Sequence, residues 1–375
     1  MRVLPAVLLG LAMCGTVSPA AHADTYRDLL NQFNEIVFGN VVSGSETEGR
    51  AVIGGNLTQS GSANYCFQTS DGSGPCGNSS LPATTPQVGS ITVGAATQSF
   101  GALTGYGNVS GSGVTASKGN IFIGGTNTGA LSLTTNTQTA YVATQGTSSA
   151  VGGNGNLVYS AKSVGVTPAS QNGTVSQGTF AMPSFATTFQ TPLQALSSYL
   201  GSMTGIAQGT SNAFNATPTT ISGTAVTVYN VLGSNLPTVI QNIGFNLNGA
   251  QTVVINVTGA VGALPTNLNT FAGQDQVIWN FVGQGSLTLP SWAGTILATS
   301  SALTMNGISQ GDIVAASLTQ GANEIHNYAF SGNLSFVPVT TGGSSLPTPE
   351  PRGIAIMALA IVALGAVRGR FRRQG

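Results

Sequence analysis

The sequence predicts an all-β fold, a right-handed parallel β-solenoid with one long helix packed alongside it. Glycine accounts for 52 of the 375 residues and charged residues for only 5%, while 41% are hydrophobic. This composition is typical of a β protein with many tight turns. Ile278, Ile296 and Val314 are spaced by 18 residues, a period that fits one coil of a solenoid. A β-sandwich is the alternative, because its strands also recur at short intervals of about 8–12 residues.

The first half of the chain is predicted to hold a short helix followed by strands. Tyr26, Leu29, Leu30 and Phe33 have helical spacing within residues 25–33, which predicts an amphipathic helix. Short apolar runs bounded by Gly, Asn or Ser follow, and each run predicts a strand. These runs are Glu35–Gly39, Ala51–Ile53, Ser90–Val93, Asn120–Ile123, Leu131–Leu133, Ala140–Ala143 and Asn156–Tyr159.

The middle of the chain predicts one long helix over residues 184–203. Its apolar residues recur every three to four positions and mark one helix face. They are Phe185, Phe189, Leu193, Leu196, Leu200 and Met203. Pro192 suits the first turn of a restarted helix, because proline is tolerated there and breaks a helix interior. Strands then resume at Ala225–Tyr229, Thr252–Val257, Val277–Phe281, Thr295–Leu297, Ile313–Ala316 and Glu324–Tyr328.

The charges are sparse and unevenly placed. Residues 24–349 contain four basic residues and nine acidic ones, which gives this part a net charge of about −5. The basic residues are Arg27, Arg50, Lys118 and Lys162. Neutralising a phosphate backbone takes several Lys or Arg contacts, so the composition excludes nucleic-acid binding.

The N-terminus has the features of an export signal. Arg2 precedes an apolar run over residues 3–13, and Ala21-His22-Ala23 supplies small residues at a cleavage site. We therefore expect signal peptidase to remove residues 1–23. A lipoprotein site at Cys14 is the alternative, and the bulky Met13 before it disfavours that site.

The C-terminus has three ordered features, a Pro-Glu-Pro triplet, an apolar stretch over residues 353–367 and an arginine-rich end. The residues concerned are Pro349, Glu350, Pro351, Arg368, Arg370, Arg372 and Arg373. Together they resemble the PEP-CTERM sorting signal, here residues 348–375 after a linker at 336–347. The resemblance implies recognition by exosortase, an inner-membrane enzyme of Gram-negative bacteria that make exopolysaccharide. A plain C-terminal membrane anchor is the alternative, with the arginines held on the cytoplasmic side.

Cys66 and Cys76 are the only cysteines after the predicted signal peptide. In an exported chain, a close pair of this kind predicts a disulfide that closes a small surface loop. A metal site at these cysteines would need further ligands nearby, and His326 is the only histidine in the mature chain. The disulfide is therefore the favoured interpretation.

Four segments of the chain carry a family resemblance. Residues 33–40 and 45–56 are similar to the opening of the choice-of-anchor A domain, and residues 311–318 and 324–328 to its close. The motif residues are Glu46, Glu48, Gly49, Arg50, Gly54, Gly55 and Asn56. The resemblance covers roughly residues 28–331. It implies an adhesive domain at 24–335, with an ice-binding-like β-solenoid, and it brings no catalytic residues.

The search for chemistry yields little. Ser309 lies in a Gly-x-Ser-x-Gly pattern, with Asp312 and His326 following in hydrolase order. A nucleophile elbow needs a helix after the serine, and a strand is predicted there instead. We therefore expect no catalytic residues, no cofactor and no enzyme. A β-helix polysaccharide lyase stays a remote alternative, because four cations are few for its base and its acidic substrate.

Glu46, Glu48 and Arg50 are the densest charge cluster of residues 24–349. They indicate either a cation or sugar site or a structural pair of Glu48 with Arg50, and the structural pair is favoured. No metal site is predicted.

The ligand is only weakly indicated. Trp292 follows a turn and is the one candidate for stacking on a sugar, whereas Trp279 lies in an apolar strand and is expected to be buried. Ice binding would need a flat, regular face of short hydroxyls, and no Thr-x-Thr recurs at the coil period. The sequence thus predicts an exported, non-catalytic adhesive or structural protein of the cell surface, matrix or exopolysaccharide layer. An ice- or polysaccharide-binding module is the alternative.

Overall fold

The computed structural model describes residues 24–61, 63–66, 90–93, 96–99, 102–111, 113–117, 119–147 and 151–338. The chain divides into two units, Met1–Pro338 and Val339–Gly375, and the second lies wholly outside the described residues. Several predicted features also lie outside them: the signal peptide at 1–23, Cys76, and the sorting signal at 348–375. Among the described residues, no helix is long and apolar enough to cross a bilayer.

The centre of the fold is a closed ring of eight parallel strands, defined by their backbone pairings. Each strand of the ring pairs with the next, and the last pairs again with the first. In order around the ring they are β1 (Glu35–Val37), β3 (Ala51–Ile53), β8 (Leu103–Gly105), β11 (Ile121–Asn127), β9 (Val109–Gly111), β4 (Leu57–Gln59), β2 (Val41–Ser43) and β28 (Ile313–Gln320).

This ring corrects the predicted topology. The all-β class is confirmed, but the right-handed parallel β-solenoid is wrong, because the pairings close into a barrel with further strands bonded outside it. The β-sandwich alternative does not fit either, since the ring is parallel throughout. The closure depends on β1 pairing with β28, where Glu35 lies opposite Ile313. A pairing between segments so far apart in the chain cannot be predicted from the periodicity of either segment alone.

Further strands extend the sheet on both sides of the ring, and all of them pair in parallel except the last one named below, which is antiparallel to its neighbour. Beyond β11 lie β13 (Thr139–Gln145), β15 (Asn156–Lys162) and β16 (Val175–Gln177). Beyond β28 lie β26 (Thr295–Met305), β24 (Ser286–Leu289), β23 (Val277–Val282), β22 (Thr252–Thr258), β20 (Thr224–Leu232), β17 (Ile206–Ala207) and β19 (Thr219–Ile221). Apart from Asn256, strand β22 consists of β-branched residues, and it is almost wholly buried, as expected of a parallel strand covered on both faces.

Shorter strands form four smaller sheets. One contains β5 (Ala63–Tyr65), β10 (Val114–Ala116), β12 (Leu131–Leu133) and β14 (Val151–Gly153), and another contains β25 (Trp292–Ala293), β27 (Ser309–Gln310) and β29 (Ile325–His326). The two pairs are β18 (Ala213–Asn215) with β21 (Gly244–Asn246) and β6 (Ser90–Val93) with β7 (Ala96–Ser99). Most of the strands predicted from apolar runs are therefore present.

Residues that lie opposite each other on neighbouring later strands are 17 positions apart in the sequence, one fewer than the predicted period. Trp279 lies opposite Ile296, and Ile296 opposite Ile313. A slip of one residue moves a side chain to the other face of a sheet. Accordingly Ile296 points into the barrel core, whereas Ile278 and its neighbours on the same face pack toward the long helix.

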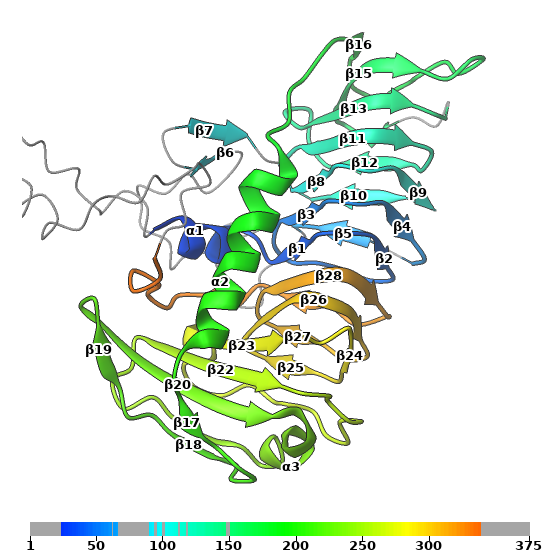
Figure 1. Cartoon of the computed structure of the whole chain (residues 1–375). Coiled ribbons are helices and arrows are strands. Elements are labelled where there is room, and N and C mark those ends of the chain that lie inside the picture. Colours follow the sequence, from blue (N-terminus) through cyan, green and yellow to red (C-terminus); the bar gives the residue numbers. More distant parts are fainter. Residues whose placement is uncertain are drawn as a thin grey trace, which may run out of the picture. The chain divides into compact units, whose positions relative to one another are not determined.

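The predicted long helix is present as a π-helical turn, η2 (Ala186–Gln190), continued by α2 (Thr191–Ser202) (Figure 1). Pro192 lies in the first turn of α2, as predicted. The buried face carries Phe189, Leu193, Leu196 and Leu200, which pack on outward side chains of the sheet. Within the described residues, the other helices are α1 (Asp24–Gln32), η3 (Gly233–Asn235), α3 (Leu236–Val239) and η4 (Gln274–Gln276).

Buried amides fasten α2 to the sheet. The Asn280 side chain donates to the Ser197 carbonyl at 3.0 Å and accepts from the Ser197 hydroxyl at 2.7 Å. Asn256 on the neighbouring strand donates to the Leu200 carbonyl at 2.8 Å, and Asn280 donates to the Asn256 side chain at 2.8 Å. The helix therefore covers one side of the sheet and leaves other strands of the ring exposed.

Candidate functional site

Strands β24, β26, β28, β2, β4 and β9 lie side by side in parallel register on a part of the sheet away from α2. Their central residues are buried leucines and valines that point into the core. They are Leu287, Leu303, Leu318, Val41, Leu57 and Val109. Because side chains alternate along a strand, the residues on either side of each of these point outward.

The outward residues form two columns, which we call the ladder face. The first column runs through Ser286, Ala302, Ser317, Asn40, Asn56, Asn108 and Thr126, and the second through Thr288, Thr304, Thr319, Val42, Thr58 and Ser110. All but Ala302 and Val42 carry a hydroxyl or an amide, and none is charged. Neighbouring rungs are about 4.8 Å apart and the two columns about 6.6 Å apart, as parallel strand geometry dictates.

The asparagines of the first column are linked from rung to rung. The Asn40 side-chain oxygen accepts the backbone N–H of Asn56 at 2.9 Å, and the Asn56 oxygen accepts that of Asn108 at 2.9 Å. The Asn108 oxygen accepts the backbone N–H of Thr126 at 2.8 Å. These bonds fix the side chains in one orientation, and the three asparagines are exposed, so their amide groups remain able to donate to a ligand.

A stack of glycines lies directly beside this asparagine ladder. Each glycine backbone N–H donates to the glycine carbonyl of the preceding rung, Gly55 to Gly39 at 2.9 Å and Gly107 to Gly55 at 3.1 Å. A Cβ on Gly55 would lie 2.5 Å from the Gly39 carbonyl carbon. The Gly54-Gly55-Asn56 part of the predicted family motif is therefore a corner where only glycine fits against the next rung.

Inward polar residues brace the ends of the ladder strands. The Ser43 hydroxyl donates to the Gln320 side chain at 2.8 Å, and Gln320 donates to the carbonyls of Glu46 and Asn323. Buried hydrogen bonds of this kind rigidify a turn. The ladder face is thus held in place before any ligand arrives, which lowers the entropic cost of binding.

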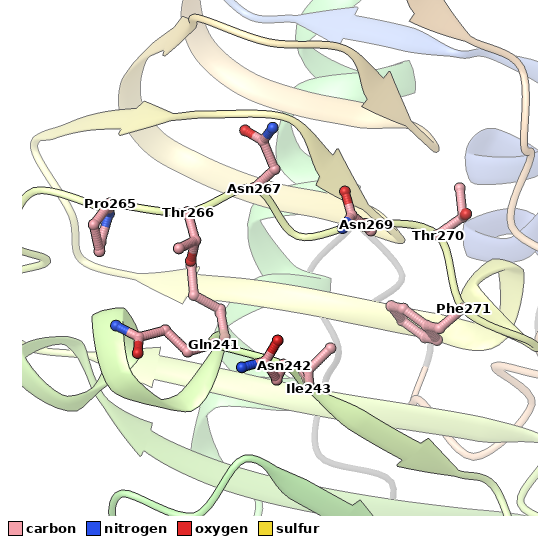
Figure 2. Close-up of a pocket in the computed structure, with 10 residues that line it drawn as sticks. Gln241, Asn242, Ile243, Pro265, Thr266, Asn267, Asn269, Thr270 and Phe271 are labelled. Atoms are coloured by element: carbon pink, nitrogen blue, oxygen red, sulfur yellow. The ribbon is translucent and has the colours of Figure 1, made fainter.

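A pocket of about 530 Å³ lies between the segment after α3 and the loop over residues 265–271 (Figure 2). Its lining is uncharged and rich in amides and hydroxyls. The polar members are Gln241, Asn242, Thr266, Asn267, Asn269 and Thr270. Phe271 supplies an aromatic ring that stacks on Phe245, with centroids 4.5 Å apart. Sugar-binding sites commonly combine an aromatic ring with neutral polar groups.

A second pocket, of about 430 Å³, lies at the end of the ladder face. Ser286 and Thr288, the terminal rung of the two columns, line it together with Leu264, Pro290 and Asn306. Polar surface therefore continues from the columns toward the segment that precedes the 265–271 loop.

Trp292, the predicted stacking residue, is fully buried. Its ring packs against Trp279 at a centroid distance of 5.0 Å and against Phe281 at 5.9 Å. A ring with no exposed face cannot stack on a sugar, so Trp292 belongs to the core. Trp279 is buried as predicted, and its indole N–H donates to the Ala293 carbonyl at 3.0 Å.

The residues of the hydrolase-like pattern are held in separate interactions. Ser309 is buried, and its hydroxyl donates to the Gly311 carbonyl at 3.2 Å. Asp312 accepts the backbone N–H of Phe330 at 2.8 Å. The ring nitrogens of His326 contact Gln310 at 3.1 Å and Glu324 at 2.9 Å. His326 thus bonds to neither of the other two residues of the pattern.

The acidic family motif is largely buried. Glu46 accepts a hydrogen bond from the Asn64 side chain at 2.8 Å, and Glu48 accepts the backbone N–H of Asn327 at 2.8 Å. Arg50 is 2% exposed, and burial lowers its pKa to about 10. Gly49 is needed because a Cβ would lie 2.6 Å from the Asn34 side chain. The motif therefore joins the first strands of the chain to its last ones.

Two further carboxyls lie inside the protein. Glu35 points into the core, and burial raises its pKa to about 7, although the Thr47 hydroxyl donates to it at 3.0 Å. Burial also raises the pKa of Asp312 well above its usual value, against hydrogen bonds from Phe330, Asn34 and Thr295. Neither carboxyl reaches the surface, and both belong to the interior of the fold.

Sequence reasoning missed the ladder face for two reasons. The face alternates Asn, Ser, Thr and Ala in its first column, so a search for Thr-x-Thr does not find it. The spacing is also irregular, since Asn56 and Asn108 are 52 residues apart whereas Asn40 and Asn56 are 16 apart. The available signal was a tripeptide with a central Leu or Val between small polar residues, as in Asn56-Leu-Thr58 and Ser317-Leu-Thr319.

The fold and this face define a β protein with a braced, uncharged polar surface and a helix on its other side. The chain belongs to the family described as "Putative Ice-binding-like adhesive domain", whose model matches residues 26–327. The adhesive-domain part of the sequence prediction is thereby confirmed. No curated protein and no solved structure matches the chain significantly.

Proposed function

We propose that the ladder face is the adhesive surface of this domain and that it binds a neutral polysaccharide of the extracellular matrix or exopolysaccharide layer. The observation that carries the proposal is the pair of uncharged columns of hydroxyls and amides on adjacent parallel strands. An extended glycan presents hydroxyls at regular intervals, so it can bond to several rungs at once. Many weak hydrogen bonds then add up to one adhesive contact.

The chemistry of the face favours a neutral glycan over an acidic one. An acidic polysaccharide would require Lys or Arg at the contact, and the ladder face has neither. Asparagine amides donate and hydroxyls both donate and accept, which suits sugar hydroxyls. The pocket of about 530 Å³ offers a sugar further contacts, the Phe271 ring and several amides (Figure 2). Part of its lining, the loop over residues 265–271, directly follows the segment 261–264 that lines the pocket at the ladder face.

The proposal involves no catalytic step and no cofactor. It is supported by the separation of Ser309 from His326, which each bond to other residues. The predicted disulfide of Cys66 with Cys76 is part of the proposal, and Cys66 is buried at the end of β5.

Export and retention complete the proposal and are supported by the sequence. Signal peptidase would remove residues 1–23, and the segment 348–375 would hold the chain in the inner membrane of a Gram-negative cell until exosortase acts near Glu350. Processing would then place the domain at the cell surface. Deletion of residues 348–375 should shift the protein to the periplasm or medium, and Glu350→Ala should leave a membrane-held precursor. Intact-mass spectrometry of the surface protein tests this, because a tail retained through Gly375 would leave only a plain anchor.

Ice is the second candidate ligand, favoured by the regular rungs of the ladder face. A lattice of water molecules could be matched by evenly spaced hydroxyls, although Val42 interrupts the second column. Two assays separate the ligands: retention on insoluble neutral polysaccharide, and inhibition of ice recrystallisation by the purified protein. Our proposal predicts retention without ice activity. Ice activity without retention would replace it by the second candidate.

A further inference from the structure

Two motifs that are far apart in the sequence meet in the fold, the segment 46–50 and the strand β29. Thr47 forms a parallel bridge with Ile325. The backbone N–H of Glu48 donates to the Ile325 carbonyl at 2.9 Å, and that of Ile325 donates to the Glu46 carbonyl at 3.0 Å. This backbone pairing sets the Glu48 side chain beside those of Glu324 and His326. One potential ligand atom from each of the three lies within 4.8 Å of the others.

The side chains of this cluster are held by groups outside it. His326 Nδ1 lies 3.1 Å from the Gln310 side-chain oxygen, which leaves Nε2 directed to Glu324 Oε2 at 2.9 Å. Glu48 is 6% exposed, and its Oε2 accepts the Asn327 backbone N–H at 2.8 Å. Orientation of a histidine through its other ring nitrogen is the usual support of a metal ligand.

We propose that Glu48, Glu324 and His326 together bind one Zn²⁺ ion. One imidazole and two carboxylates match the nitrogen and oxygen ligands of zinc sites that keep a fourth position for water. The charges of the ion and of the two carboxylates cancel, which suits a partly buried site. The fourth position is open to solvent because the Glu324 side chain is 46% exposed. Calcium is a poor fit, since it takes six to eight oxygen ligands.

Zn²⁺ binds an imidazole through a nitrogen lone pair, so His326 Nε2 is the coordinating atom while Nδ1 keeps its contact with the Gln310 side chain. The site is separate from the ladder face, and it joins residue 48 near the start of the domain to residues 324 and 326 near its end. Bound Zn²⁺ therefore stabilises the fold by linking the two.

The test is a calorimetric titration of the untagged protein with ZnCl₂ after removal of metals by EDTA. We expect one site per chain and a rise of several degrees in Tm. Glu324→Gln is the first variant, because its half-exposed side chain can change without unfolding the chain. His326→Gln is the second. Each should weaken Zn²⁺ binding at least tenfold.

Glu46→Gln is the matched control, because it removes the same charge two residues from Glu48 while its oxygen can still accept from Asn64. It should bind Zn²⁺ as the unchanged protein does. The proposal is overturned if millimolar Zn²⁺ gives neither heat nor a change in Tm, or if Glu324→Gln binds as tightly as Glu46→Gln. Stabilisation by Ca²⁺ that His326→Gln leaves unaltered would also overturn it, because the imidazole would then not be a ligand.

Discussion

The side-chain oxygen of Asn56 accepts a 2.9 Å hydrogen bond from the backbone N–H of Asn108, 52 residues further along the chain. The backbone N–H of Asn56 in turn donates to the Asn40 side chain. Each rung of the ladder face is therefore positioned by the rung before it. This relation explains how a face assembled from distant segments keeps its regularity although the loops between its strands differ greatly in length.

Loss of one asparagine of the ladder should lower stability moderately. Asn56→Ala leaves the Asn108 N–H without its acceptor, at a site where water can replace it because Asn56 is exposed. We expect a loss of about 1 kcal/mol in the free energy of unfolding. Denaturant titration measures it, and no loss at all would show that the ladder bonds do not support the fold.

Addition of a side chain within the glycine stack should lower the stability more than the loss of one ladder asparagine does. In Gly55→Ala the new Cβ would meet the Gly39 backbone at 2.5 Å, whereas in Gly244→Ala it would meet nothing within 4 Å. Backbone cannot move aside as a side chain can, so we expect Gly55→Ala to destabilise by more than about 2 kcal/mol. The Gly244→Ala variant is the control and should change the midpoint of denaturation little. Equal effects of the two substitutions would contradict the close stacking of the rungs.

Stability should decrease as the pH rises from about 4.5 to 7. Burial raises the pKa of Glu35 from 4.5 to about 7 in the folded protein, so between these values the unfolded chain loses its proton first. Ionisation then favours the unfolded state, and stability present below pH 4.5 is lost by pH 7, by about 3 kcal/mol. The pKa of Asp312 is also raised by burial and contributes in the same direction.

Denaturation of Glu35→Gln across this pH range tests the assignment. The variant cannot ionise at residue 35, so its stability should change less between pH 4.5 and 7 than that of the unchanged protein. Asp312, whose pKa burial also raises, contributes to the slope that remains. An identical slope in both proteins would show that Glu35 is not the buried acid responsible.

The buried amides under α2 should be essential for docking the helix. Asn280→Ala removes the acceptor of the Ser197 hydroxyl and the donor to the Asn256 side-chain oxygen. Unsatisfied buried polar groups of this kind cost about 2–4 kcal/mol in total. Asn269→Ala removes an exposed amide of the same size and serves as the control. Thermal unfolding compares them, and equal Tm values would contradict the proposed role of Asn280.

The predicted disulfide should add stability without being required for folding. Reduction of a Cys66–Cys76 bridge would free a loop of about ten residues, which in the chain-entropy model contributes about 2–3 kcal/mol. We therefore expect a lower Tm with a cooperative transition retained, since the core contains many other contacts. Thiol labelling followed by mass spectrometry checks the premise, and free thiols at both positions in protein from its native host would refute it.

The local elements could be predicted from sequence, and their assembly could not. The apolar runs Ala51–Ile53 and Leu131–Leu133 coincide with β3 and β12, because turn residues bound them sharply. The helical spacing over 184–203 likewise identified η2 and α2. The pairing of β1 with β28 has no local signature, since it depends on the whole path of the chain between them. It was this pairing that replaced the predicted solenoid by a closed ring.

The candidate site was missed because its strands are short and polar on one side. Val41–Ser43 and Leu57–Gln59 have only three residues each, too few for an alternating pattern to stand out from a loop. Their outward residues acquire meaning only when neighbouring rungs are placed in register. For Trp292 the prediction was wrong in the opposite direction. The turn-like sequence around it indicated an exposed ring, whereas the ring is buried in the structure.

The most direct test of the account is the affinity of the ladder face for neutral polysaccharide after a change of its charge. The double variant Thr58→Lys, Thr319→Lys places two long cationic side chains on the rungs that flank Val42, where both threonines are exposed. The control is the double variant Thr219→Lys, Thr220→Lys, which adds the same charge on the exposed strand β19. We predict that the first pair reduces binding to insoluble neutral polysaccharide at least tenfold with little change in Tm, while the second pair binds as the unchanged protein does. Equal binding by both pairs would contradict the assignment of the ladder face as the adhesive surface.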